Sequence, residues 1–262
     1  MRSSFLILTA LLTSLISIYG QGGQGRRVAL VQSSFVWGDC AANISAFDSK
    51  IREIKGCDLI ILPELFISGC DMQRRDKEVK DSVKRHVAAQ YPLVIEQMQQ
   101  WAKHSGAVVI GSTIYEEDSL FYNRLLAVYP SAQYLTYDKH NCFKKGAFSP
   151  GNDHLVITVN GHRYATYICY DLRFEEWSRN EGRYDSAIYI ANWPESRSND
   201  WDQLLSQRAA QNEATVIGVN CVGIDPSGVS FIGQSAIYNP DGTLHSKCND
   251  REDQTLIVEL NF

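Results

Sequence analysis

The stretch Tyr167-Ile168-Cys169-Tyr170-Asp171-Leu172-Arg173-Phe174 marks the point where an apolar, β-rich run gives way at once to polar and charged residues. A cysteine at the carboxyl end of a buried strand is held by the sheet, and its sulfur faces the crevice where catalytic groups of α/β proteins gather. Cys169 is therefore a candidate nucleophile, and Arg173 would place a permanent positive charge beside the same pocket. A buried structural thiol is the alternative for Cys169.

Strands and helices alternate on both sides of this stretch. The run Asp58-Leu59-Ile60-Ile61-Leu62 is continuously apolar after its first residue, which is typical of a strand covered on both faces. The other predicted strands lie at 27–32, 107–110, 154–159, 162–168, 186–191 and 215–220, the helices at 39–56, 92–106, 174–181 and 199–214, and the further hairpin turns at 130–133 and 239–242. This order predicts the α/β class with a mixed sheet, and periodicity leaves open one doubly wound sheet or two stacked sheets.

Length and composition indicate one large domain without a bound metal or nucleic acid. The 262 residues are 44% hydrophobic and 21% charged, and no shift in composition divides the chain. The net charge is −5 and no basic block occurs, which argues against nucleic acid as a partner. None of the seven cysteines forms a C-x-x-C pair and no histidine cluster completes a zinc spacing, so we predict no metal site.

The N-terminus has the three-part pattern of a secretory leader. Arg2 precedes an apolar run at 5–18, and a polar, glycine-rich segment follows Gly20. We therefore predict a signal peptide at 1–20, a linker at 21–26 and a single domain at 27–262. The run is too short for a comfortable membrane span, so we expect export to the periplasm or the medium without a stable anchor. An uncleaved anchor, or a mis-assigned start codon on a cytoplasmic protein, is the alternative.

Three side chains that suit covalent acyl transfer lie just past predicted strand ends. Glu64 follows a buried strand, Lys139 ends a hairpin, and Cys169 ends the strand at 162–168. A thiol nucleophile needs a base for its proton and a cation beside the thiolate and the developing oxyanion. A carboxylate, an ammonium and a thiol meet these needs without histidine. A turn carboxylate at Glu64 and a solvated charge at Lys139 are the ordinary alternatives.

These residues lie in blocks that resemble a known family. Leu62-Pro63-Glu64-Leu65-Phe66, Tyr137-Asp138-Lys139-His140 and the block from Cys169 to Phe174 resemble, in order and spacing, the signatures of the nitrilase, or carbon–nitrogen hydrolase, superfamily. Segments 189–194, 196–198 and 201–209 look like the omega-amidase branch, which hydrolyses 2-oxoglutaramate and related 2-oxo acid amides. The resemblance runs from about Val28 to the end of the chain.

The resemblance implies an α-β-β-α sandwich of two mixed sheets flanked by helices, and a homodimer. It also implies Cys169 as nucleophile, Glu64 as general base and Lys139 as the cation on the oxyanion side. The backbone N–H of Tyr170 would help to hold the oxyanion.

The remaining implied roles concern substrate binding. Arg173 is our choice to bind the substrate's carboxylate, because a planar guanidinium suits a bidentate contact. Trp193 and Phe66 would form pocket walls, or would be ordinary core aromatics.

The implied reaction hydrolyses the terminal amide of a small 2-oxo acid amide, such as 2-oxoglutaramate or 2-oxosuccinamate, to the carboxylate and ammonia through a cysteine thioester. It needs no cofactor. The alternatives are another exported amidase of this superfamily, for instance one for pantetheine-like amides, a degenerate homologue that only binds an amide or carboxylate, and a Cys–His hydrolase using His140, His154 or His162. The loop at 140–150 lacks the second glutamate usual in the family, and Glu195 is a candidate replacement.

Overall fold

The computed structural model describes residues 26–69, 77–143 and 147–261. The predicted signal peptide and residues 21–25 of the predicted linker lie outside these ranges, so export stays a prediction, as does the homodimer. Arg26, which we assigned to the linker, is instead the first residue of β1. Within the described ranges, no helix is both long enough and apolar enough to cross a membrane.

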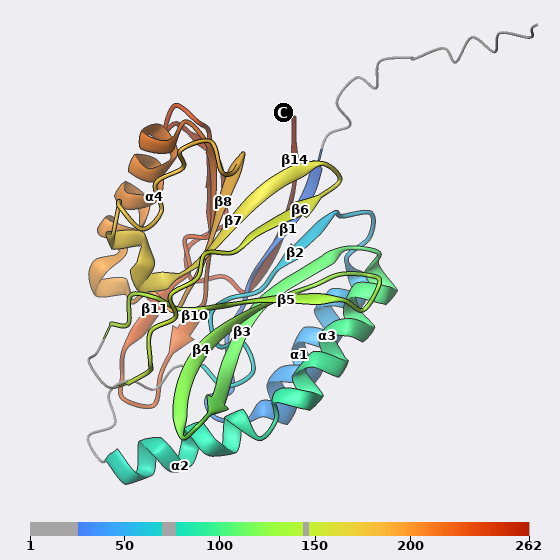
Figure 1. Ribbon diagram of the computed structural model, residues 1–262, viewed down its shortest axis with the longest axis vertical. Helices are drawn as coiled ribbons and strands as arrows, with labels where there is room; N and C mark the ends of the chain where they lie inside the picture. Colours follow the sequence, from blue (N-terminus) through green and yellow to red (C-terminus); the bar gives the residue numbers. More distant parts are fainter. Residues whose placement is uncertain (1–25, 70–76, 144–146, 262) are drawn as a thin grey trace, which may run out of the picture.

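Two six-stranded sheets form the centre of the molecule (Figure 1). The first has the order β14-β1-β2-β3-β4-β5 and the second the order β13-β12-β9-β8-β7-β6. The strands of the first sheet are β1 (Arg26–Gln32), β2 (Leu59–Ile61), β3 (Val108–Glu117), β4 (Leu120–Val128), β5 (Tyr134–Asp138) and β14 (Gln254–Leu260). Those of the second are β6 (Val156–Val159), β7 (His162–Ile168), β8 (Ser186–Ala191), β9 (Thr215–Asn220), β12 (Ala236–Tyr238) and β13 (Leu244–Lys247). Both sheets combine parallel and antiparallel pairs, which confirms the α/β class and decides for two stacked sheets.

Helices cover the outer face of each sheet. Figure 1 shows α1 (Cys40–Glu53) and α3 (Tyr91–Ser105) on one side and α4 (Ser198–Asn212) on the other. Leu59 and Ile61 of β2 lie in the apolar layer between the sheets, whereas Ile60 lies in the layer beneath α1 and α3. The continuous apolar run of this strand is therefore buried on both faces, as predicted.

Local signals place most helix ends correctly. The Asp39 side chain accepts a hydrogen bond from the Ala42 N–H (2.9 Å) and caps α1, and Gly106, at φ +72°, ends α3 in the left-handed conformation. The sequence analysis missed α2 (Lys77–Ala88), the hairpin of β10 (Val222–Ile224) and β11 (Ser230–Ile232), and β14.

The helix predicted at 174–181 is wrong. The chain forms a 3₁₀ turn at Cys169–Arg173 (η1) and then further turns, with N–H groups bonded three residues back, as from Trp177 to Phe174 (3.2 Å). The Trp177 ring lies between the imidazoles of His140 and His154, with ring centres 3.6 and 3.9 Å away. These tertiary contacts outweigh the local helical preference.

Candidate active site

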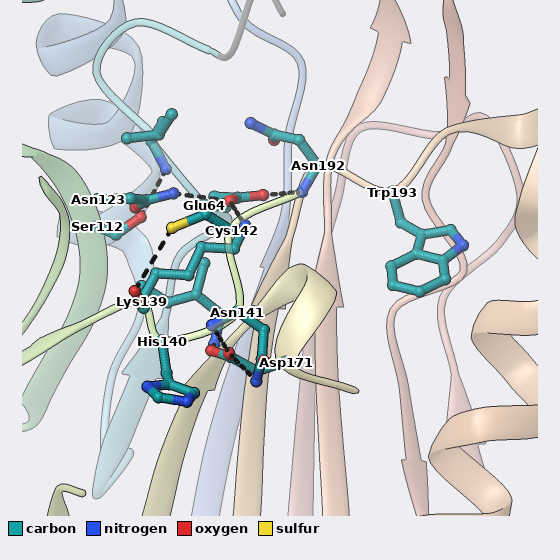
Figure 2. Close-up of polar contacts among 12 residues, drawn as sticks. Glu64, Ser112, Asn123, Lys139, His140, Asn141, Cys142, Asp171, Asn192 and Trp193 are labelled. Carbon is teal, nitrogen blue, oxygen red and sulfur yellow. Dashed lines mark hydrogen bonds and ion pairs between the residues drawn. The ribbon is translucent and has the colours of Figure 1, made fainter. Parts of the chain in front are cut away.

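A buried carboxylate–ammonium pair lies where the two sheets meet. Glu64 and Lys139 are 3% and 5% exposed, and Lys139 Nζ lies 2.7 Å from Glu64 Oε1. Asn123 Nδ2 donates to the same oxygen (2.7 Å), and the Asn192 N–H donates to Oε2 (2.8 Å). Figure 2 shows Glu64 held in this way between Asn123 of the first sheet and Asn192, which follows β8 of the second. The carboxylate is thus fixed by donors from both sheets.

The charged groups around Lys139 favour its protonated, cationic form. Burial alone would lower the pKa of Lys139, but the neighbouring Glu64 carboxylate and the Cys169 group outweigh burial and raise this pKa above its ordinary value. Lys139 is therefore a permanent cation at physiological pH and cannot serve as a base.

Cys169 begins η1 at the end of β7, and its thiol is neutral at rest. Burial and the charge of Glu64 raise the pKa of Cys169 to about 12, although Lys139 and the Asn192 N–H act in the opposite direction. We expected the lysine to favour the thiolate. The structure differs because Lys139 is already paired with Glu64, so its charge is largely compensated.

The backbone at both reactive residues is held in an unusual conformation. Cys169 has φ +46°, and Leu65, directly after Glu64, has φ +49°. Residues other than glycine in this region cost of order 1–3 kcal/mol and persist where the surroundings fix them. The Ser112 hydroxyl accepts a hydrogen bond from the Leu65 N–H (2.8 Å), and the Asp171 carboxylate accepts one from the Ile168 N–H (3.0 Å). Side-chain acceptors thus secure the sharp turns that present Glu64 and Cys169.

Asp171 joins the loop of Lys139 to the turn of Cys169. Its fully buried carboxylate accepts hydrogen bonds from the Tyr137 hydroxyl (2.7 Å), from the Asn141 N–H (2.7 Å) and from Asn141 Nδ2 (3.0 Å), besides the bond from Ile168. Figure 2 shows the pair of bonds from Asn141. Burial raises the pKa of Asp171, against the influence of Lys139 and these donors. The sequence analysis gave Asp171 no role, yet it fixes the position of two of the three predicted catalytic residues.

The three predicted catalytic residues line one pocket of about 740 Å³, its open mouth included. That volume suits a small organic molecule. Apolar and aromatic side chains form most of its wall, which also contains Glu64, Lys139 and Cys169. The aromatic members are Phe143, Phe148, Tyr170, Trp193 and Phe231.

Tyr170, Arg173 and Trp193 line this pocket, as the sequence analysis expected, but Phe66 does not. The ring of Phe66 is fully buried beneath the helices, with its centre 5.4 Å from the ring of Phe47 and 5.9 Å from that of Trp101. The assignment of Phe66 to the pocket wall is therefore wrong, and its alternative as a core aromatic holds.

Two other candidates also lie away from the pocket. Glu195, the proposed replacement for the missing loop glutamate, is paired with Arg251. No histidine occurs among the described residues that line the pocket, since His140 and His154 stack on Trp177 and His162 bonds to Ser186 (2.8 Å). This arrangement excludes the Cys–His alternative. In the described part of the chain, no group of three or more metal-ligating side chains is arranged to hold an ion.

Asn123 and Asn192 are the polar partners that sequence reasoning missed. Asn192 directly follows the strand β8, so the rule that selected Glu64, Lys139 and Cys169 could also have selected it. Asn123 lies within β4, and no local signal distinguishes it from an ordinary strand residue.

Comparison with known proteins places these observations in a family. The family model described as carbon–nitrogen hydrolase matches residues 27–262. The omega-amidase YafV of Escherichia coli K12 is 34% identical over 242 residues, 91% of either chain, and the 2-oxoglutaramate amidase of Bacillus subtilis is 28% identical over 248 residues, 90% of either chain.

Solved structures agree with these relatives. The protein XC1258 of Xanthomonas campestris, described as a CN-hydrolase superfamily protein, superposes with a TM-score of 0.83 at 28% identity over 91% of each chain. Nit3 of Saccharomyces cerevisiae, at 19% identity, shares the fold, with a TM-score of 0.78 over 91% of this chain and 90% of its own. The predicted resemblance to the nitrilase superfamily and its omega-amidase branch is confirmed, and the chain belongs to the carbon–nitrogen hydrolase family.

Proposed function

We propose that this hydrolase cleaves the terminal amide of small 2-oxo acid amides, with 2-oxoglutaramate and 2-oxosuccinamate as representatives, and releases ammonia through a thioester on Cys169. The observation that carries the proposal is the placement of a strand-end thiol in one pocket with the Glu64–Lys139 pair. The names of the relatives, omega-amidase and 2-oxoglutaramate amidase, support the substrate class.

The first chemical step forms the thioester. Glu64 takes the thiol proton, and the sulfur attacks the amide carbon. Two side-chain donors, Lys139 and Asn123, occupy Oε1, whereas the N–H group of Asn192 is the described nitrogen donor to Oε2, so we assign this proton to Oε2. Lys139 Nζ and the Tyr170 N–H stabilise the oxyanion, and ammonia leaves with the proton that Glu64 returns.

The second step releases the acid. Glu64 removes a proton from water, the resulting hydroxide attacks the thioester carbon, and the C–S bond breaks. The proton on Glu64 returns to sulfur, so the thiol and the carboxylate base are regenerated.

The proposed function is tested by ammonia release from 2-oxoglutaramate and from glutamine. Glutamine presents an ammonium where the 2-oxo acid presents a neutral carbonyl, and the pocket already contains Lys139, Arg173 and Arg197. We expect kcat/KM for 2-oxoglutaramate to exceed that for glutamine by at least about 100-fold, since like charges in a binding site cost several kcal/mol. A pantetheine-like secondary amide releases an amine instead of ammonia, so cleavage of such an amide alone, followed by amine release, would indicate the other amidase class. Cleavage of none of these amides would indicate a binding protein.

The state of the thiol is tested by alkylation of the free enzyme with iodoacetamide. Because burial and Glu64 raise the pKa of Cys169 far above neutral pH, its thiolate is a minor species there, and the labelling rate of the Cys169 peptide should rise about tenfold per pH unit between pH 7 and 10. Mass spectrometry of the peptide measures this rate, and glutathione, which levels off near its own pKa, is the control. A plateau for Cys169 below pH 9 would show a preformed thiolate and contradict the prediction.

A further inference from the structure

Of the described residues that line the pocket, two carry a guanidinium, Arg173 and Arg197. Both lie against the Trp193 ring, with their guanidinium carbons 4.9 and 6.0 Å from its centre. Their partners differ. Arg173 Nη2 lies 2.5 Å from Asp200 Oδ2, so its charge already has a counter-ion.

Among the residues that the structure describes, no carboxylate is paired with Arg197. Its Nε is buried and makes no hydrogen bond, and no carboxylate of the described residues forms an ion pair with it. Its guanidinium carbon lies 4.6 Å from the centre of the Phe143 ring. A buried donor without an acceptor costs about 1–3 kcal/mol, and more when it belongs to a charged group. Arg197 thus brings to the pocket wall a charge that no described carboxylate neutralises, and an anion in the pocket would supply the missing counter-ion.

The backbone holds Arg197 firmly in place. Residues Glu195–Arg197 form a 3₁₀ turn (η2), in which the Arg197 N–H donates to the Pro194 carbonyl (3.0 Å). The Arg197 carbonyl accepts from Trp193 Nε1 (2.7 Å). The same tryptophan that supports the guanidinium therefore also fixes the start of its side chain.

The carboxylate of Asp225, which also lies on the wall of the pocket, is occupied by other donors. Asp225 lines the pocket, but its Oδ1 accepts hydrogen bonds from the Ser227 N–H (2.8 Å), the Ser227 hydroxyl (2.7 Å) and the Val229 N–H (2.9 Å). It closes the turn between β10 and β11 and forms no ion pair with Arg197 in the described part of the chain.

We propose that Arg197, rather than Arg173, is the receptor for the substrate's free carboxylate, and that it selects amides bearing a carboxylate at the far end. Arg173 then supports the wall through Asp200 and Trp193. The inference rests on the proposed function and deepens it. It assigns the two unlike ends of the substrate to two cations, with the amide oxygen at Lys139 and the carboxylate at Arg197.

The test is a binding measurement that requires no turnover. In the Cys169→Ala background, isothermal titration with 2-oxoglutarate should give a Kd raised about 30- to 100-fold by Arg197→Gln, the range of a charged hydrogen-bonded contact. Arg197→Lys keeps the charge but loses the planar guanidinium group. Its Kd should therefore lie between that of the Cys169→Ala protein and that of the protein that also carries Arg197→Gln. Arg251→Gln removes a charge beside η2 from a residue that does not line the pocket, and should change Kd by less than threefold.

Kinetics give a second measurement. With Cys169 present, Arg197→Gln should lower the ratio of kcat/KM for 2-oxoglutaramate to that for pentanamide, which lacks the carboxylate, by a similar factor, through KM rather than kcat. If Arg197 had only a structural role, its replacement would lower kcat/KM for 2-oxoglutaramate and for pentanamide by the same factor, and their ratio would not change.

Three results would overturn the inference: a loss of 2-oxoglutarate binding in Arg173→Gln but not in Arg197→Gln, an unchanged substrate ratio in Arg197→Gln, or no binding of 2-oxoglutarate to the Cys169→Ala protein. Failure of the proposed function looks different. The wild type would then release no ammonia from any amide, while the binding of 2-oxoglutarate could still depend on Arg197.

Discussion

Replacing Cys169 with alanine is expected to lower kcat for ammonia release from 2-oxoglutaramate by about 10⁵-fold or more, the scale seen when a catalytic nucleophile is removed. Among the described cysteines, Cys169 is the one that follows β7 beside the Glu64–Lys139 pair, so we expect no other described thiol to substitute for it. A coupled ammonia assay under saturating substrate measures kcat, and thermal unfolding shows whether the fold is retained.

The matched control is Cys142→Ala. Cys142 lines the same pocket, and its sulfur contacts the Lys139 carbonyl (3.7 Å), but burial raises its pKa to about 11 and it does not follow β7 as Cys169 does. We expect its loss to change kcat less than tenfold. If Cys142→Ala abolished the activity and Cys169→Ala did not, the assignment of the nucleophile would be reversed.

Replacing Glu64 with glutamine is expected to lower kcat by about 10³- to 10⁵-fold, because the glutamine amide fits the same space but cannot accept the thiol proton. The change also leaves Lys139 as a buried charge without its counter-ion. Removing one partner of a buried pair costs about 3–5 kcal/mol, so the free energy of unfolding should fall as well. Urea denaturation measures this fall separately from the rate.

Glu195→Gln is the matched control for Glu64. Glu195 is paired with Arg251 and does not line the pocket, so its replacement should leave kcat within about twofold, as is usual for an exposed pair. A loss in Glu195→Gln comparable to that in Glu64→Gln would mean that Glu195 does replace the missing loop glutamate.

The sequence indicated that Glu64, Lys139 and Cys169 lie together because these three predicted catalytic residues share a simple rule. Glu64, Lys139 and Cys169 each follow a strand, and strand ends from both sheets meet in one pocket. The continuous run of β2 likewise predicted a strand buried on both faces, because burial on two sides requires apolar residues at every position.

What the sequence could not predict depends on contacts between distant segments. Asn123 reads as an ordinary strand residue, yet its amide holds Glu64. Phe66 adjoins the catalytic motif but points toward the helices after the left-handed turn at Leu65. The ion pair between Arg173 and Asp200 likewise cannot be predicted from the sequence, because the two residues lie on different elements that the fold brings together.

The position of Glu64 between Asn123 of one sheet and Asn192 beyond a strand of the other has a consequence for refolding. In a folding intermediate in which one sheet has formed and the other has not yet packed on it, the Glu64 carboxylate lacks one of these two donors. Cys169, which follows a strand of the second sheet, is then not held beside it. Recovery of turnover after dilution from denaturant should thus lag behind the return of secondary structure and report the moment at which the layers dock.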